Sequence, residues 1–187
     1  GALATDANMM KLYGTDEVDH RRASRPFGEN CGFTIGESCQ YFILMDDALA
    51  VELGAPCLGA VTDVFVDADG TKKSISAPGP GNHISMAKAV AAASSVVGKA
   101  GVRDKSFVLA HGSSTPQNRV SESQIFDQVA EAFDISEWPV VAVKAYLGHT
   151  IAPASADQLA AALGSFKYGI LPGIPTIDAV ADDVHQN

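Results

Sequence analysis

The chain has 187 residues, 47% of them hydrophobic, which is enough for one domain with a substantial core or for part of a larger domain. Thirteen basic residues stand against twenty-two acidic ones, and the formal net charge is −9. The longest basic runs are Lys72-Lys73 and Arg21-Arg22, so the composition argues against binding to nucleic acid or to an anionic membrane.

The ends of the chain and its cysteines indicate the cellular setting. No apolar run is long enough to span a bilayer, and Gly1 is not followed by the charged start of a secretion signal. Because the chain does not begin with Met, we expect it to be cut from something longer. Cys31, Cys39 and Cys57 are odd in number and lack C-x-x-C spacing, so we expect reduced, buried thiols in a cytoplasmic protein, with no metal and no cofactor.

The first half of the chain favours extended structure. Residues 33–45 are rich in β-branched and aromatic types and predict a strand buried on both faces, broken or bulged near Gly36. A second strand is predicted over residues 57–66. Asp69-Gly70 is a turn signal, and residues 76–82 predict a loop without regular structure.

Helical patterns occur at four places. Asp46 or Asp47 caps a short predicted helix that Gly54 ends. A capping box, Ser121-Glu122-Ser123-Gln124, opens another predicted helix. Small and apolar residues dominate a predicted helix over residues 84–99 that Gly101 closes, which suits close packing against a sheet; they include Ala87, Val90, Ala91, Ala93 and Val97. After the capping box, one face of the helix is expected to carry Ile125, Val129 and Phe133. In a last helix over residues 153–168, Leu159, Leu163 and Phe166 are expected to point inward.

Two short apolar strands end at chemically active side chains. Residues 106–110 run directly into His111, and residues 140–143 run directly into Lys144. Alternating strands and helices of this length predict an α/β layered fold with a mostly buried sheet. Ligands of such sheets usually bind at the carboxyl ends of the strands, so both residues are candidates for a site.

Two segments carry the candidate chemistry: residues 111–116, HGSSTP, and residues 144–150, KAYLGHT. Each places an imidazole beside a glycine in a strand-to-helix turn, where the backbone can approach a ligand closely. His149 precedes a helix whose dipole disfavours the imidazolium. A neutral imidazole donates one hydrogen bond without carrying charge, which suits it to hold a developing enolate oxygen.

These segments resemble the HGT-x-TP and K-x-x-x-x-GH motifs of the β-ketoacyl-acyl-carrier-protein synthases, which are ketosynthases of the thiolase-like superfamily. Further similarity lies in residues 24–27, SRPF, in Gly32-Phe33 and Gly36-Glu37, and in residues 170–177. The ordered set covers nearly the whole chain. It implies that residues 1–187 are the C-terminal half of a thiolase-like α/β/α fold.

The resemblance also implies roles for four residues. His111 and His149 would assist decarboxylation of a malonyl thioester and stabilise the enolate. Lys144 would organise the site electrostatically, and Glu122 would orient Lys144 by an ion pair. We expect both imidazoles and the ammonium to converge on one cavity. The implied partners are an acyl carrier protein, acyl and malonyl thioesters, the N-terminal half of the same enzyme and, in the complete protein, a second copy.

The chain also departs from the family pattern. The catalytic cysteine and a glycine-rich GFGG segment fall outside it, and neither Cys31 nor Cys39 occupies the nucleophile's position. The fragment alone is therefore not expected to condense acyl chains. Substitutions that indicate a divergent subfamily are Gln158 for a common glutamate, Asn118-Arg119 for the usual GD, and residues 151–156 for a glycine-richer segment.

Other interpretations remain open. Either histidine alone is more often a structural residue, and Glu122 could simply serve a helix N-terminus. Ser85-Met86-Ala87-Lys88 matches the S-x-x-K of penicillin-binding enzymes but has no partner motif, and Asp67-Ala68-Asp69-Gly70 resembles a calcium loop but lacks its later ligands. The alternatives to a condensing enzyme are a non-catalytic subunit of the chain-length-factor type and a thiolase-like interaction module.

Overall fold

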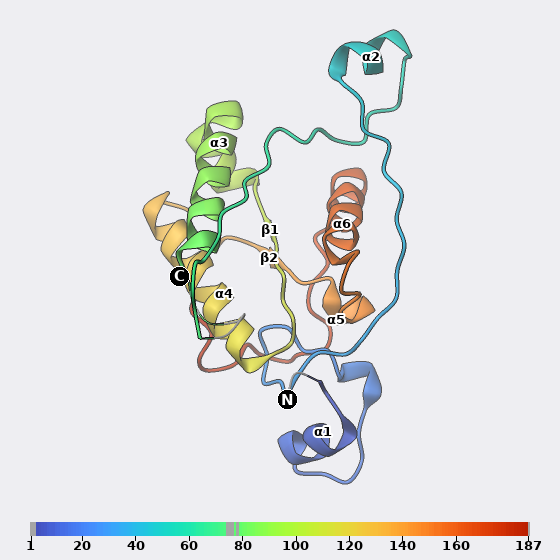
Figure 1. The fold of residues 1–187 in the computed structure, drawn as a ribbon, viewed down its shortest axis with the longest axis vertical. Coiled ribbons are helices and arrows are strands. Elements are labelled where there is room, and N and C mark those ends of the chain that lie inside the picture. Colours follow the sequence, from blue (N-terminus) through green and yellow to red (C-terminus); the bar gives the residue numbers. More distant parts are fainter. Residues whose placement is uncertain (1–2, 74–76, 78, 187) are drawn as a thin grey trace.

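A computed structural model describes residues 3–73, 77 and 79–186, and Figure 1 shows its ribbon. The elements in chain order are α1 (Asp6–Tyr13), η1 (His20–Arg22), α2 (Asp47–Glu52), α3 (Pro80–Lys105), β1 (Val108–Leu109), α4 (Pro116–Ala132), β2 (Val140–Val141), α5 (Lys144–Leu147) and α6 (Ala154–Tyr168).

A two-stranded parallel sheet lies at the centre of the molecule. Val108 pairs with Val140 and Leu109 with Val141, which confirms in shorter form both strands predicted to end at the site. Figure 1 shows α3 and α4 on one side of these strands and α6 on the other. Two parallel valine-rich strands need cover on both faces, and the helices supply it.

The core divides into two clusters of apolar side chains. The first joins α3 to α4 through Val90, Val102, Val129, Ala130 and Ile135, with Ile125 and Phe133 packed against it. The apolar face predicted for the helix after the capping box, with Ile125, Val129 and Phe133, is therefore confirmed. The other cluster, of Phe27, Ala110 and Ala142, lies where the strands end and supports the turns that follow them.

The predicted start of α2 and the predicted end of α6 agree with the structure, whereas the boundaries of α3 and the start of α4 differ. Asp46 caps α2 through its side chain, and α6 ends at Gly169, which is left-handed with φ 66°. However, α4 begins at Pro116 with Thr115 as its cap, so the capping box at 121 lies inside the helix. Proline is favoured in a first helical turn, and that signal outweighs the later Ser-x-x-Gln pattern.

The helix α3 also begins earlier than predicted, at Pro80 inside the expected loop. The side chain of Asp69 accepts hydrogen bonds from the N–H groups of Gly81 and Asn82 and so caps this helix from outside its own first turn. It passes the expected end at Gly101 with a kink at Gly98. Residues 76 and 78 of the predicted loop lie outside the described residues.

The two strands predicted in the first half do not form. Within residues 33–45 the structure has only isolated bridges, Leu3 with Phe33 and Ile35 with His149, and residues 57–66 carry no regular element. Tyr41 is 92% exposed, against the burial expected for residues 33–45, and Val66 in the second segment is 88% exposed. A strand requires a neighbour for its backbone hydrogen bonds, and among the described residues only 33–36 have such partners, whereas residues 41–45 and 58–66 have none.

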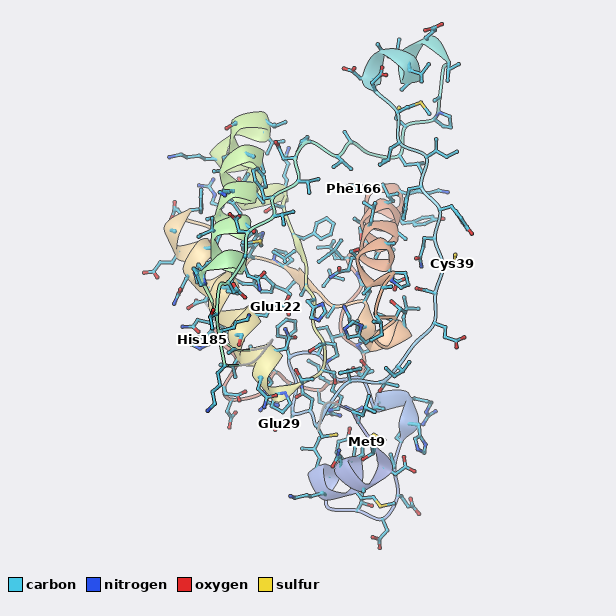
Figure 2. The ribbon with its side chains drawn as sticks, in the orientation of Figure 1. Met9, Glu29, Cys39, Glu122, Phe166 and His185 are labelled. Carbon is cyan, nitrogen blue, oxygen red and sulfur yellow. The ribbon has the colours of Figure 1, made fainter. Side chains whose placement is uncertain are left out.

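Figure 1 shows this part of the chain leaving the body along the outer side of α6, carrying α2 at its far end and returning to α3. Phe166 of α6 is 63% exposed, although its ring packs edge to face on that of Phe107, just before β1. Cys31, Cys39 and Cys57 are all free, as expected, but Cys39 and Cys57 are exposed and not buried. Figure 2 shows Cys39 on the extended segment beside α6.

No helix in the described part of the chain is long and apolar enough to cross a membrane.

Candidate active site

The imidazoles of His111 and His149 face one another. Their ring centroids are 5.0 Å apart and the rings meet edge to face at 77°. Both rings line an open cavity of about 1090 Å³, together with Glu122, Ser113 and Phe33. The structure therefore brings together two side chains that lie far apart in the sequence.

The end of β1 and the turn after it place His111. Gly112 has φ 50°, and a Cβ at this position would come within 2.9 Å of the Cβ of Ala142, so the turn can press against β2 only without a side chain. Ser113 donates its N–H to the side-chain oxygen of Asn118, and the Ser113 hydroxyl lies 3.0 Å from that of Thr115. The first turn of α4 thus holds the segment in place.

Glu122 does not form the direct ion pair with Lys144 that the resemblance implies. Its two carboxylate oxygens accept the N–H groups of His111 at 2.6 Å and of Gly112 at 2.7 Å. Figure 2 shows Glu122 on α4, beside the strands. Burial raises the pKa of Glu122, while these two hydrogen bonds and the charge of Lys144 oppose the rise. The carboxylate therefore fixes the backbone of the His111 turn.

Lys144 lies behind His111 and not in the cavity. It is only 2% exposed, and its ammonium donates a hydrogen bond to the backbone oxygen of His111 at 2.6 Å. The expectation that all three groups converge on the cavity is therefore wrong for the ammonium. Burial lowers the pKa of Lys144, and the charges of Glu122 and Asp157 oppose this change.

Close backbone packing against residues 34–36 places His149. His149 donates its N–H to the oxygen of Thr34 at 2.6 Å and accepts the N–H of Gly36 at 3.0 Å. A Cβ on Gly36 would stand 2.0 Å from the backbone oxygen of Leu147, so only glycine permits this approach. The ring of Phe33 packs on that of His149 with centroids 5.2 Å apart.

Hydrogen bonds fix which nitrogen carries the proton in each neutral imidazole. Ile151, at a left-handed φ of 65°, donates its N–H to Nδ1 of His149 at 3.0 Å. The ammonium of Lys144, which can only donate, lies 3.5 Å from Nδ1 of His111. Both Nδ1 atoms are therefore acceptors, and each ring has its N–H at Nε2.

Both imidazoles are held in the neutral form. Burial, then the charge of Lys144, then His149 lower the pKa of His111 to about 4. Burial and Lys144 also lower the pKa of His149. The arrangement can thus supply two uncharged N–H donors at neutral pH.

The competing motif interpretations have structural explanations. The Ser85 hydroxyl and the Lys88 ammonium both bind the carboxylate of Asp67, at 3.0 Å and 2.8 Å. The carboxylate of Asp69 caps α3 and also contacts Lys72. These acidic residues are engaged by donors of the protein, and the described residues contain no cluster of three or more potential metal ligands.

Two residues that support the histidine turns are absent from the predicted site. Asp157 is buried in α6 and accepts a hydrogen bond from the hydroxyl of Thr150 at 2.5 Å. Gln158 donates its amide N–H to the backbone oxygen of Leu109 at 3.1 Å and to that of Ala110. The sequence signal for Asp157 is its spacing, because it falls on the same buried stripe of α6 as Ala154 and Ser165.

Comparison with known proteins gives a consistent result. Residues 58–178 match the family model described as beta-ketoacyl synthase, C-terminal domain. The chain is 69% identical over 186 residues to the beta-ketoacyl-[acyl-carrier-protein] synthase FabY of Pseudomonas aeruginosa, and it spans 29% of the length of that protein. It is 28% identical over 166 residues to the tetracenomycin polyketide synthase ketoacyl synthase alpha subunit of Streptomyces glaucescens, covering 87% of this chain and 37% of that one.

Solved structures agree with the sequence matches. The crystal structure of the noncanonical ketosynthase FabY from P. aeruginosa superposes with a TM-score of 0.97 over 100% of this chain and 29% of that one, at 69% identity. The ishigamide ketosynthase/chain length factor superposes with a TM-score of 0.69 at 26% identity, covering 93% of this chain and 40% of that one. A type II polyketide ketosynthase in complex with its acyl-carrier protein has a TM-score of 0.66 at 22% identity, over 88% of this chain and 42% of that one, and shares the fold.

Proposed function

We propose, since this chain belongs to the β-ketoacyl synthase family, that it forms the histidine-bearing part of a β-ketoacyl-acyl-carrier-protein synthase. The complete enzyme would join an acyl thioester to malonyl-acyl-carrier-protein in fatty-acid or related acyl-chain synthesis. In this proposal residues 1–187 are the C-terminal half of a thiolase-like α/β/α fold, and the catalytic cysteine comes from another part of the longer protein.

The observation that supports this proposal is the pair of facing imidazoles, in each of which Nδ1 faces a donor, so that the proton is assigned to Nε2. Decarboxylation of a malonyl thioester breaks the bond between the α-carbon and the carboxylate, and the electron pair moves into an enolate as carbon dioxide leaves. Negative charge then collects on the thioester oxygen. The N–H groups of His111 and His149, which share one cavity wall, are suited to donate to that oxygen.

The next step needs the part of the enzyme outside this chain. The enolate carbon attacks the carbonyl carbon of an acyl group held on a cysteine, a carbon–carbon bond forms, and the cysteine thiolate leaves. A neutral pair of donors is better suited than an imidazolium pair, because Lys144 already places one buried positive charge beside His111. Lys144 and Glu122 would hold the His111 turn rigid and keep its ring neutral.

The test is to replace His111 or His149 by Ala in the full-length protein and to follow release of carbon dioxide from malonyl-acyl-carrier-protein. Loss of one oxyanion donor typically lowers the rate about 100- to 1,000-fold, so each variant is expected to fall by this factor. His20→Ala serves as the control, because His20 is exposed and its ring contacts Asp6. Undiminished decarboxylation in either site variant would overturn the assignment.

A non-catalytic subunit of the chain-length-factor type is the second candidate. The similarity to the ishigamide ketosynthase/chain length factor fits either role. Retention of His111, His149, Lys144 and Glu122 favours the enzyme, because a subunit without chemistry has no need of the two neutral donors. A full-length protein that cannot accept a radiolabelled acyl group from its carrier protein would favour the helper role.

The cytoplasmic location and the homodimer stay predictions. Light scattering of the full-length protein tests whether it is a homodimer.

A further inference from the structure

Asp157 connects α6 to the His149 turn. Its carboxylate is 5% exposed and accepts hydrogen bonds from three side chains: the hydroxyl of Thr150 at 2.5 Å, the hydroxyl of Ser38 at 3.1 Å, and the amide of Gln40. Thr150 directly follows His149, and Ser38 follows the segment that pairs with His149 through Ile35. The carboxylate therefore ties together the two pieces of chain that hold this imidazole.

Gln158 connects the same helix to the His111 turn. Its amide donates to the backbone oxygens of Leu109 and Ala110, the last two residues before His111. Successive residues of an α-helix point about 100° apart, so adjacent side chains at positions 157 and 158 reach in different directions from one rigid turn. The first turns of α6 thus contact the supports of both imidazoles.

We propose that Asp157 and Gln158 are positioning residues that set the distance and orientation between the imidazoles of His111 and His149. This inference rests on the proposed function. A buried carboxylate is costly unless its oxygens are bonded, and the three donors to Asp157 come from the His149 turn and from the segment that follows Gly36, and not from α6 itself. The amide of Gln158 supplies donors to two carbonyl oxygens, which an ionised glutamate at the same position could not do.

The substitutions Asp157→Asn, Thr150→Val and Gln158→Met, made in the full-length protein, test this inference. Misplacement of a reacting group by about 1 Å can lower a rate by about 100-fold, so each variant is expected to lower kcat for malonyl decarboxylation by about 10- to 100-fold with KM nearly unchanged. Because Asp157 and Thr150 act through one hydrogen bond, the double variant is expected to lose no more than Asp157→Asn alone. Ser155→Ala, an exposed change in the same helix turn, is the control and is expected to keep the wild-type kcat.

Imidazole ¹⁵N spectra separate positioning from a merely structural role. The wild type is expected to show His149 as a single neutral tautomer with its proton at Nε2, and Asp157→Asn or Thr150→Val is expected to give a mixture of tautomers. A lower melting temperature with unchanged kcat and unchanged tautomer would overturn the inference, as would additive losses in the double variant. If the wild type itself releases no carbon dioxide, the proposed function fails, and the tautomer spectra still decide the positioning.

Discussion

The chemistry of His111 depends on its immediate surroundings. Burial lowers its pKa first, and the ammonium of Lys144, 3.5 Å from Nδ1, lowers it further, to about 4. Because the folded chain disfavours the imidazolium, the unfolded chain takes up this proton at a higher pH. The free energy of unfolding is therefore expected to fall as the pH decreases from about 6.5 towards 4.

The charge of Lys144 can be removed to test this assignment. In Lys144→Met the pKa of His111 is expected to rise from about 4 while staying below its ordinary value of 6.5, because burial of the ring remains. An NMR titration of the imidazole measures this shift. Lys99→Met, at an exposed position of α3, is the matched control and is expected to leave the titration unchanged. A His111 titration that is identical in Lys144→Met and the wild type would contradict the proposed electrostatic role of Lys144.

Glu122 is the second residue whose role can be isolated. Its two oxygens accept the N–H groups of His111 and Gly112, and an amide offers only one oxygen. Glu122→Gln therefore leaves one backbone N–H without its partner, which is expected to lower the free energy of unfolding by about 1–3 kcal/mol. Urea denaturation of the variant measures the loss. Glu131→Gln makes the same change at an exposed position of α4 and is expected to have little effect, and equal losses in the two variants would refute the role given to Glu122.

At the scale of the elements, the site depends on the close approach of residues 34–36 to the His149 turn. A Cβ at Gly36 would stand 2.0 Å from the oxygen of Leu147, whereas a Cβ at Gly164 of α6 has no neighbour within 4 Å. Gly36→Ala is therefore expected to separate the two segments and to lower both stability and decarboxylation. Gly164→Ala is expected to stabilise the protein by about 0.5–1 kcal/mol, because alanine favours the helix. Thermal unfolding and carbon dioxide release distinguish the two, and a Gly36→Ala variant with wild-type values of both would rule out the proposed close packing.

The elements also show what a single sequence can and cannot predict. The strands before His111 and Lys144 follow from short apolar runs that end at polar residues, and α6 follows from its apolar spacing and Gly169. The extended segments at 33–45 and 57–66 have equally strong strand composition, but composition does not say whether a neighbouring strand is present. The expectation of an ion pair between Glu122 and Lys144 was wrong, because spacing along the chain does not specify which donors lie nearest to a carboxylate in space.

At the scale of the whole molecule, the described chain exposes unusually apolar extended segments. Tyr41, Ile43 and Leu44 are 92%, 87% and 77% exposed, and Val64 and Val66 on the returning segment are 78% and 88% exposed. Contiguous exposure of this kind marks a surface that normally contacts protein. The chain spans only 29% of the length of the FabY relative, so in the proposed complete enzyme the remaining chain would cover these segments.

Hydrogen exchange tests this arrangement directly. Amides of residues 41–45 and 58–66 have no backbone hydrogen bonds among those described, so in the isolated chain they are expected to exchange at rates close to those of an unfolded peptide. In the full-length protein the same amides are expected to be protected, because they would pair as strands of a larger sheet. The amides of α3 around Val90 are the internal control, since they lie in the core of this chain and should be protected in both. Fast exchange of both segments in the full-length protein would contradict the larger sheet and would leave the extended composition of these segments without an explanation.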